Sequence, residues 1–146
     1  MTATAVRENR SLAAVAEAAV RDLVRVSNWG NSSFVNLPLI YPDGSSVTVK
    51  LDIVQAGQRV DEVGVRVSDH GFAYRLLEQI GAQRSFGRTA GGVAEREELT
   101  VDKRSIYVDV PFDAVERAIC DVAAASWSVV DRVYSKLSDT GRKQAN

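Results

Sequence analysis

The chain has only one cysteine, one histidine and three prolines among its 146 residues. Cys120 alone cannot form an internal disulfide or a cysteine-cluster metal site, and His70 alone cannot supply a site built from several imidazoles. No apolar run approaches the ~20 residues of a membrane span, and residues 1–10 lack the apolar segment of a secretory leader. These absences predict a cytoplasmic protein with no membrane association, no metal and no cofactor.

An excess of positive charge is also missing. The 18 lysines and arginines are balanced by 19 aspartates and glutamates, which gives a net charge of −1 and a pI near 5.8. Proteins that bind nucleic acid by neutralising phosphates usually carry a basic face and a pI above roughly 9. Composition therefore argues against a direct nucleic-acid binder, whereas 45% hydrophobic and 25% charged residues are typical of a globular domain.

What is present is a succession of short periodic segments. Apolar residues at helical spacing predict helices, and strict alternation predicts strands with one buried face. Pro42-Asp43-Gly44 supplies turn residues between two such strands, as in a β-hairpin. In chain order, the pattern predicts a helix over 10–27, strands over 34–41, 47–54 and 63–67, a helix over 72–80, strands over 99–101 and 106–110, and a helix over 111–137.

This order, α-β-β-β-α-β(β)-α, predicts a single α+β domain over residues 1–146. Consecutive strands with helices around them favour an antiparallel sheet of about four to five strands over a parallel doubly wound sheet. Residues 1–9 and 138–146 are polar and are expected to be flexible. Residues 82–95 contain three glycines and are expected to form a mobile loop.

The turn Ser68-Asp69-His70-Gly71 joins an alternating strand to a short helix. An Asp-His pair suggests a general base or a metal ligand. A structural role is the stronger interpretation, because Ser68 or Asp69 can accept hydrogen bonds from the first helical N–H groups and Gly71 relieves the backbone there. We therefore predict that Ser68, Asp69 and Gly71 form a structural turn.

A second chemical hypothesis is a metal-dependent nuclease. Such enzymes hold a hard cation with carboxylates and place a lysine nearby. The candidates are Asp52, Asp69, Glu95 and Lys103, whose spacing in the sequence is not diagnostic. Lys50 and Asp52 also occupy positions where the wet face of a strand needs polar residues.

The last predicted helix has the largest apolar surface. Phe112, Val122 and Val133 belong to one stripe, which also contains Ser126, and Trp127, Val130 and Tyr134 belong to a neighbouring face. Helices that pack on one sheet usually need a single stripe, so the second face must be covered either by the first helix or by another subunit. Trp and Tyr are frequent anchors of protein interfaces. We predict a homodimer that uses Trp127, Val130 and Tyr134, and we expect Cys120 to be buried.

Two family resemblances concern the fold. The segment 34–81, with Leu37-Pro38, Asp43-Gly44 and Ser68-Asp69-His70-Gly71, resembles an uncharacterised bacterial and phage domain-of-unknown-function family with a strand, a Ser-Asp-x-Gly turn and a helix. That resemblance implies no activity. The element order, the length and the low pI are similar to those of type III secretion chaperones, which implies a dimer that binds a protein partner.

These observations predict a non-enzymatic protein-binding module that is a homodimer. Its kind would be a chaperone-like adaptor, an immunity or antitoxin protein, or a phage-encoded inhibitor. Arg84 and Arg88 in the predicted loop are further candidates for contacting the partner. A metal-dependent nuclease and a direct nucleic-acid binder are the alternatives.

Overall fold

The computed structural model describes residues 2–55 and 63–145, with side chains described for 11–55 and 63–139. It confirms an α+β fold, with a sheet of six antiparallel strands instead of four to five. The elements are α1 (Thr2–Leu23), β1 (Arg25–Trp29), β2 (Ser32–Ile40), β3 (Ser46–Gln55), β4 (Val63–Ser68), α2 (Phe72–Gln79), the 3₁₀ turn η1 (Gln83–Ser85), α3 (Phe86–Glu97), β5 (Thr100–Asp102), β6 (Ser105–Val110), the 3₁₀ turn η2 (Phe112–Ala114) and α4 (Val115–Ala145).

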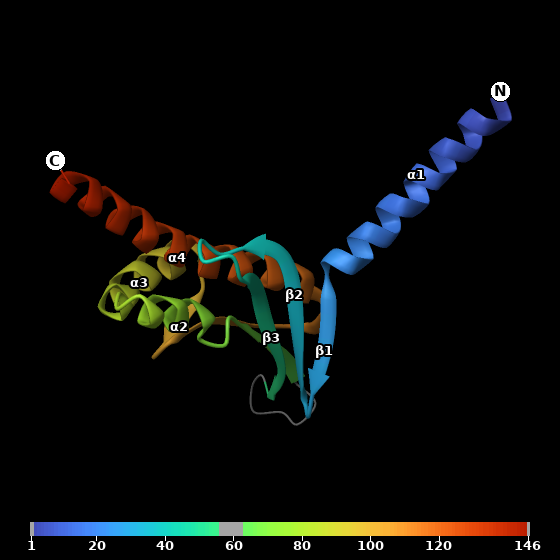
Figure 1. Cartoon of the computed structure of the whole chain (residues 1–146). Coiled ribbons are helices and arrows are strands. Elements are labelled where there is room, and N and C mark those ends of the chain that lie inside the picture. The colour runs from blue at the N-terminus through green and yellow to red at the C-terminus, as the bar shows by residue number, and fades with distance from the viewer. Residues whose placement is uncertain (1, 56–62, 146) are drawn as a thin grey trace.

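The sheet has the strand order β1-β2-β3-β4-β6-β5, and every neighbouring pair is antiparallel. Helices α2, α3 and α4 lie against one face, with α4 in contact with β2, β3, β4 and β6 (Figure 1). We call this the helix side of the sheet and the opposite face the open side. The two edges of the sheet are β1 and β5.

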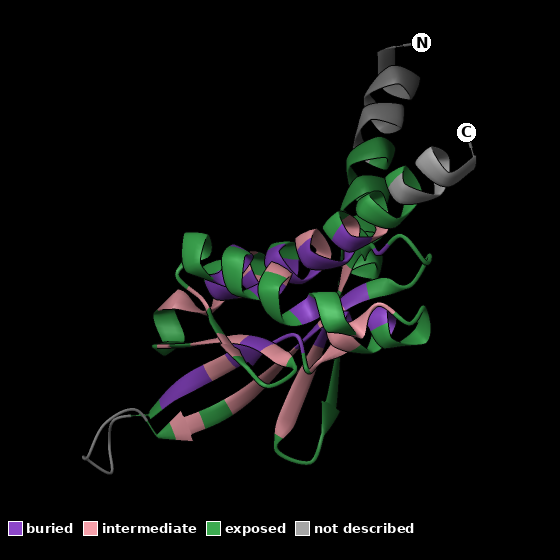
Figure 2. Cartoon of the chain, turned by 90° about the vertical axis from the view of Figure 1, so that its left-hand side faces the viewer, coloured by how far each residue is buried: buried purple, intermediate pink, exposed green. Residues whose placement is uncertain are grey.

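The core lies between the helix side and the three helices. Alternate residues of the central strands point into it, including Val47, Val49 and Val67, none of which is exposed. Helix α4 contributes Val122 and Val129 from the stripe read in the sequence (Figure 2). Each such aliphatic side chain stabilises the fold by about 1.5–3 kcal/mol when it is fully buried.

Residues 82–95 are helical, so the prediction of a mobile loop was wrong. They form η1 and most of α3, in which Phe86, Ala90, Val93 and Ala94 are buried on one side of the helix and α3 packs on α4. The three glycines of α3 are all exposed, and each costs roughly 1 kcal/mol relative to alanine. Burial of the apolar side of α3 against α4 outweighs this cost.

The first helix also differs from the prediction. Helix α1 runs from Thr2 to Leu23, and the residues after it form β1, so the end of the predicted helix 10–27 is a strand. Gly30 and Asn31 therefore make the turn between β1 and β2, with Gly30 at φ +60°, because residues 25–29 pair with β2. Residues 1–9 and 138–146 were predicted to be flexible, and most of their side chains lie outside the described residues. Their backbone is helical from Thr2 and up to Ala145.

Candidate functional site

The predicted interface on α4 is largely used within the chain. Val130 has no exposed surface, and the half-buried Tyr134 packs against the core. Trp127 is also half-buried and donates a hydrogen bond from Nε1 to the carbonyl oxygen of Ile40 (2.8 Å). Trp127 is therefore covered in part by the end of β2, whereas α3, which sequence reasoning predicted to be a loop, packs on α4 near Ala125 and Ser128. Cys120 is exposed, so the expectation that it is buried was wrong.

The excess apolar surface lies on α1 instead. Every residue from 11 to 30 is exposed, and α1 projects from the start of β1 away from the body of the molecule (Figures 1 and 2). The large aliphatic side chains Leu12, Val15, Val20 and Leu23 are each more than half exposed. Their spacing places them with Ala16 and Ala19 on one face of the helix. We call these six residues the α1 stripe.

A second apolar surface lies on the helix side of the sheet. Val26, Val35 and Val49 form one cross-strand row, and their exposure falls from 63% to 7% to 0% as the row passes under α4. Ile53 is 59% exposed near the far end of β3, and Phe112 is 58% exposed where β6 gives way to α4. We call Val26, Ile53 and Phe112, with the half-buried Leu51 between them, the uncovered strip.

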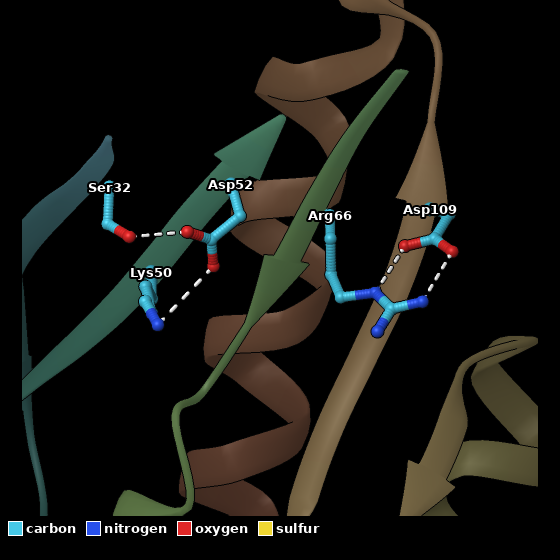
Figure 3. Close-up of polar contacts among 5 residues, drawn as sticks. All are labelled: Ser32, Lys50, Asp52, Arg66 and Asp109. Carbon is cyan, nitrogen blue, oxygen red and sulfur yellow. Dashed lines mark hydrogen bonds and ion pairs between the residues drawn. The ribbon is translucent and has the colours of Figure 1, made fainter. Parts of the chain in front are cut away.

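The open side of the sheet carries mostly polar side chains, with the exposed Trp29 at its β1 edge. Asp52 accepts a hydrogen bond from Ser32 and lies 3.5 Å from the Lys50 ammonium, and Arg66 donates two hydrogen bonds to Asp109 (2.7 and 2.9 Å; Figure 3). A shallow hollow of about 610 Å³ on this side is lined by Lys50, Asp52, Arg66, Ser68, His70, Asp102, Lys103, Arg104, Ser105 and Tyr107. Exposed ion pairs of this kind contribute about 0–1 kcal/mol each. The arrangement is that of the wet face of an antiparallel sheet.

His70 lies at the rim of this hollow in a left-handed backbone conformation, with φ 54°. Its ring meets the rings of Phe34 and Phe72 edge-on, with centroids 5.6 Å away in both cases. Partial burial lowers the pKa of His70, and the positive charges of Lys50 and Arg75 lower it further. The imidazole is therefore neutral at pH 7.

Asp69 does not face the hollow but lies in the core, with no exposed surface. Its carboxylate accepts hydrogen bonds from the backbone N–H groups of Gly71, Ala73 and Ile106 and from Ser126 Oγ, at 2.9–3.3 Å. Tyr41 Oη lies 2.6 Å from Ser126 Oγ and extends this network to β2. Burial raises the pKa of Asp69, and the four hydrogen bonds oppose that shift.

The Asp69 network connects the turn after β4 with α2, β6 and α4. Sequence reasoning found the turn but missed the distant partners Ile106 and Ser126. The signal for Ser126 was a polar residue within an otherwise apolar helical stripe. A carboxylate whose oxygens are already occupied by four donors serves to position these elements.

The nuclease candidates do not converge. Asp52 and Lys103 line the hollow on the open side, Asp69 is buried beneath α4, and Glu95 is exposed on α3. Among the side chains that the structure describes, residues 11–55 and 63–139, no three His, Cys, Asp or Glu side chains are grouped so that they could hold a metal ion. Arg84 and Arg88 are exposed on η1 and α3.

No protein family, curated protein or solved structure matches this chain, so its geometry alone carries the functional argument. No helix in the described part of the chain combines the length and the apolarity needed to span a bilayer.

Proposed function

We propose that this chain is a non-enzymatic protein-binding module, and that α1 is the element through which it binds. The observation that carries the proposal is the α1 stripe, which is exposed along the whole described length of the helix. Helices in proteins gain most of their stability from packing an apolar face, and a single helix in water is marginal. A protein surface that covers the α1 stripe would supply this packing.

The rest of the molecule suits a binding role. The buried Asp69 network and the core under α4 give a rigid body, and the charges on the open side are largely paired with one another. A chaperone-like adaptor, an immunity or antitoxin protein and a phage-encoded inhibitor all fit this description. A cytoplasmic location belongs to the proposal, because the exposed thiol of Cys120 persists in a reducing compartment. The dispersed nuclease candidates give no support to the enzymatic alternative.

Site-specific photo-crosslinking in the native cells tests the proposal. A photoreactive phenylalanine analogue replaces Val15, on the α1 stripe, or Ala14, on the opposite side of the same helix. We expect a covalent adduct with a protein at position 15 and much less adduct at position 14. Equal adducts at both positions, or none at either, would refute a binding role for the α1 stripe. The mass of the adduct also shows whether the partner is a second copy or another protein.

A further inference from the structure

We infer that the occupant of the uncovered strip is α1 from a second copy of this chain, in a reciprocal exchange of the two helices. This inference rests on the proposed function and names its partner. The α1 stripe is an apolar helix face without a sheet, and the uncovered strip offers apolar side chains on a sheet surface without a helix, beside the hydrogen-bonded pair Asn28 and Ser33. Both occur in the same chain, so two copies related by a two-fold axis can satisfy both at once.

The connection between α1 and β1 prevents the same contact within one chain. Only Val24 separates the last residue of α1 from the first residue of β1, and α1 extends away from the body of the molecule, in the direction opposite to α2 and α3 (Figure 1). Connections between elements that fold back on one another usually take 2–6 residues. For α1 to turn back onto the strip, β1 would have to release its pairing with β2, including the pair Arg25–Asn36.

The uncovered strip lies where the sheet has no helix above it. Helix α4 begins directly after η2, which follows β6, and its Trp127 reaches the carbonyl oxygen of Ile40 at the end of β2. The exposures of Val26 and Ile53 show that this path leaves part of β1 and β3 uncovered. A helix beside α4 would cover these residues and extend the helical layer across β1.

The available area is sufficient for a stable dimer. The α1 stripe runs from Leu12 to Leu23, which corresponds to a helix length of about 18 Å and a radius of roughly 6 Å with side chains included. One side of such a helix, taken as half a cylinder, has a surface of roughly 340 Å². The symmetric exchange uses two helix faces and two strips, so it buries on the order of 1,300 Å², within the range of stable interfaces. Glu17 and Arg21, on the opposite side of α1, would remain in water.

Sedimentation equilibrium of the full chain tests the exchange with two matched pairs of variants. On α1, Leu12→Lys changes the stripe and Ala14→Lys changes the opposite side. On β1, Val26→Lys changes the uncovered strip and Ser27→Lys changes the open side. We expect a wild-type dimer whose Kd rises roughly 100-fold or more for Leu12→Lys and for Val26→Lys, because symmetry applies each change twice. The two controls should remain dimeric.

A mixture of Leu12→Lys with Val26→Lys gives a further signature. Each heterodimer keeps one intact pair of surfaces, so the mixture should associate more tightly than either variant alone. Far-UV circular dichroism of each variant shows whether the body of the fold is retained.

A monomeric wild type at 100 µM would overturn the exchange, although a crosslink to another protein would leave the proposed function standing. Loss of the dimer with Leu12→Lys but not with Val26→Lys would also overturn it, because α1 would then pack against another surface. If Val26→Lys unfolds the chain, Ile53→Lys tests the same strip at its other end.

Discussion

Replacing Asp69 by alanine removes the acceptor of four hydrogen bonds from the core. Three of the donors are backbone N–H groups, which cannot turn away because they belong to the turn, α2 and β6. The fourth is Ser126 Oγ, which is fully buried in α4. Alanine leaves the three backbone donors without this partner, leaves Ser126 Oγ with Tyr41 Oη alone, and creates a small cavity among them.

The expected loss of stability follows from these donors. Leaving a buried donor unsatisfied costs about 1–3 kcal/mol, and a water molecule or a local shift recovers part of the cost when several donors share one site. We expect Asp69→Ala to lower the free energy of unfolding by about 3–5 kcal/mol, which is a large share of the ~5–15 kcal/mol typical of a domain. Asp69→Asn should lose less, because its amide keeps one oxygen acceptor and can donate to Ser126 Oγ.

Urea unfolding followed by circular dichroism and tryptophan fluorescence measures these differences. The matched control is Asp109→Ala, which removes an exposed carboxylate that also accepts two hydrogen bonds, both from Arg66. We expect this control to lose no more than about 1 kcal/mol. If Asp69→Ala lost as little as the control, the assignment of Asp69 as the central acceptor of the fold would be refuted.

Three further predictions follow from single residues. Gly71 has φ +73°, and a Cβ added there would lie 3.4 Å from a backbone oxygen, so Gly71→Ala should lower stability by about 1–2 kcal/mol. Gly92→Ala, within α3, should raise stability by about 0.5–1 kcal/mol, because nothing lies within 4 Å of the added Cβ. Thermal unfolding that ranks the two variants the other way would contradict both predictions. The pKa of His70, measured by NMR, should lie below 6.5. Because the folded pKa is lower than the unfolded one, the contribution of neutral His70 to stability is complete above pH 6.5 and declines as the pH falls towards the folded pKa. A pKa at or above 6.5, or the same decline in His70→Gln, would disprove this. Trp127→Phe should lower the free energy of unfolding by about 1–2 kcal/mol, because the hydrogen bond to Ile40 is lost, and should leave the association state unchanged. An altered sedimentation profile would instead show that Trp127 takes part in a subunit interface.

The elements that could be predicted are those whose cause is local. The hairpin between β2 and β3 is closed by hydrogen bonds from Tyr41 N to Ser45 O and from Gly44 N to Tyr41 O, and Asp43 accepts from Ser45 N. All of these groups lie within five consecutive residues. The alternating apolar residues of β3 and the apolar stripe of α4 likewise predict which face of each element is buried, whatever packs against it. Local chemistry was therefore enough for the α+β class.

The candidate surfaces could not be predicted in the same way. The second face of α4 suggests an interface because part of its cover comes from distant residues, among them Ile40, which accepts the hydrogen bond of Trp127. Helix α3, which packs on α4, contains three glycines and is predicted as a loop from the sequence. Exposed α1 has an amphipathic pattern that would look the same if it were packed on its own sheet. Helical spacing shows that a face needs cover, but it does not show which segment provides it.

By itself, the sequence determined the α+β class, the hairpin of β2 and β3, the buried face of β3 and β4, and the turn at Asp69, because each depends on residues close together in the chain. Only the tertiary structure decided that Asp69 is joined to Ile106 and Ser126, that α3 packs on α4, and that α1 has an uncovered face. Those outcomes depend on contacts between segments tens of residues apart, and burial is a property of the neighbours that the fold brings together.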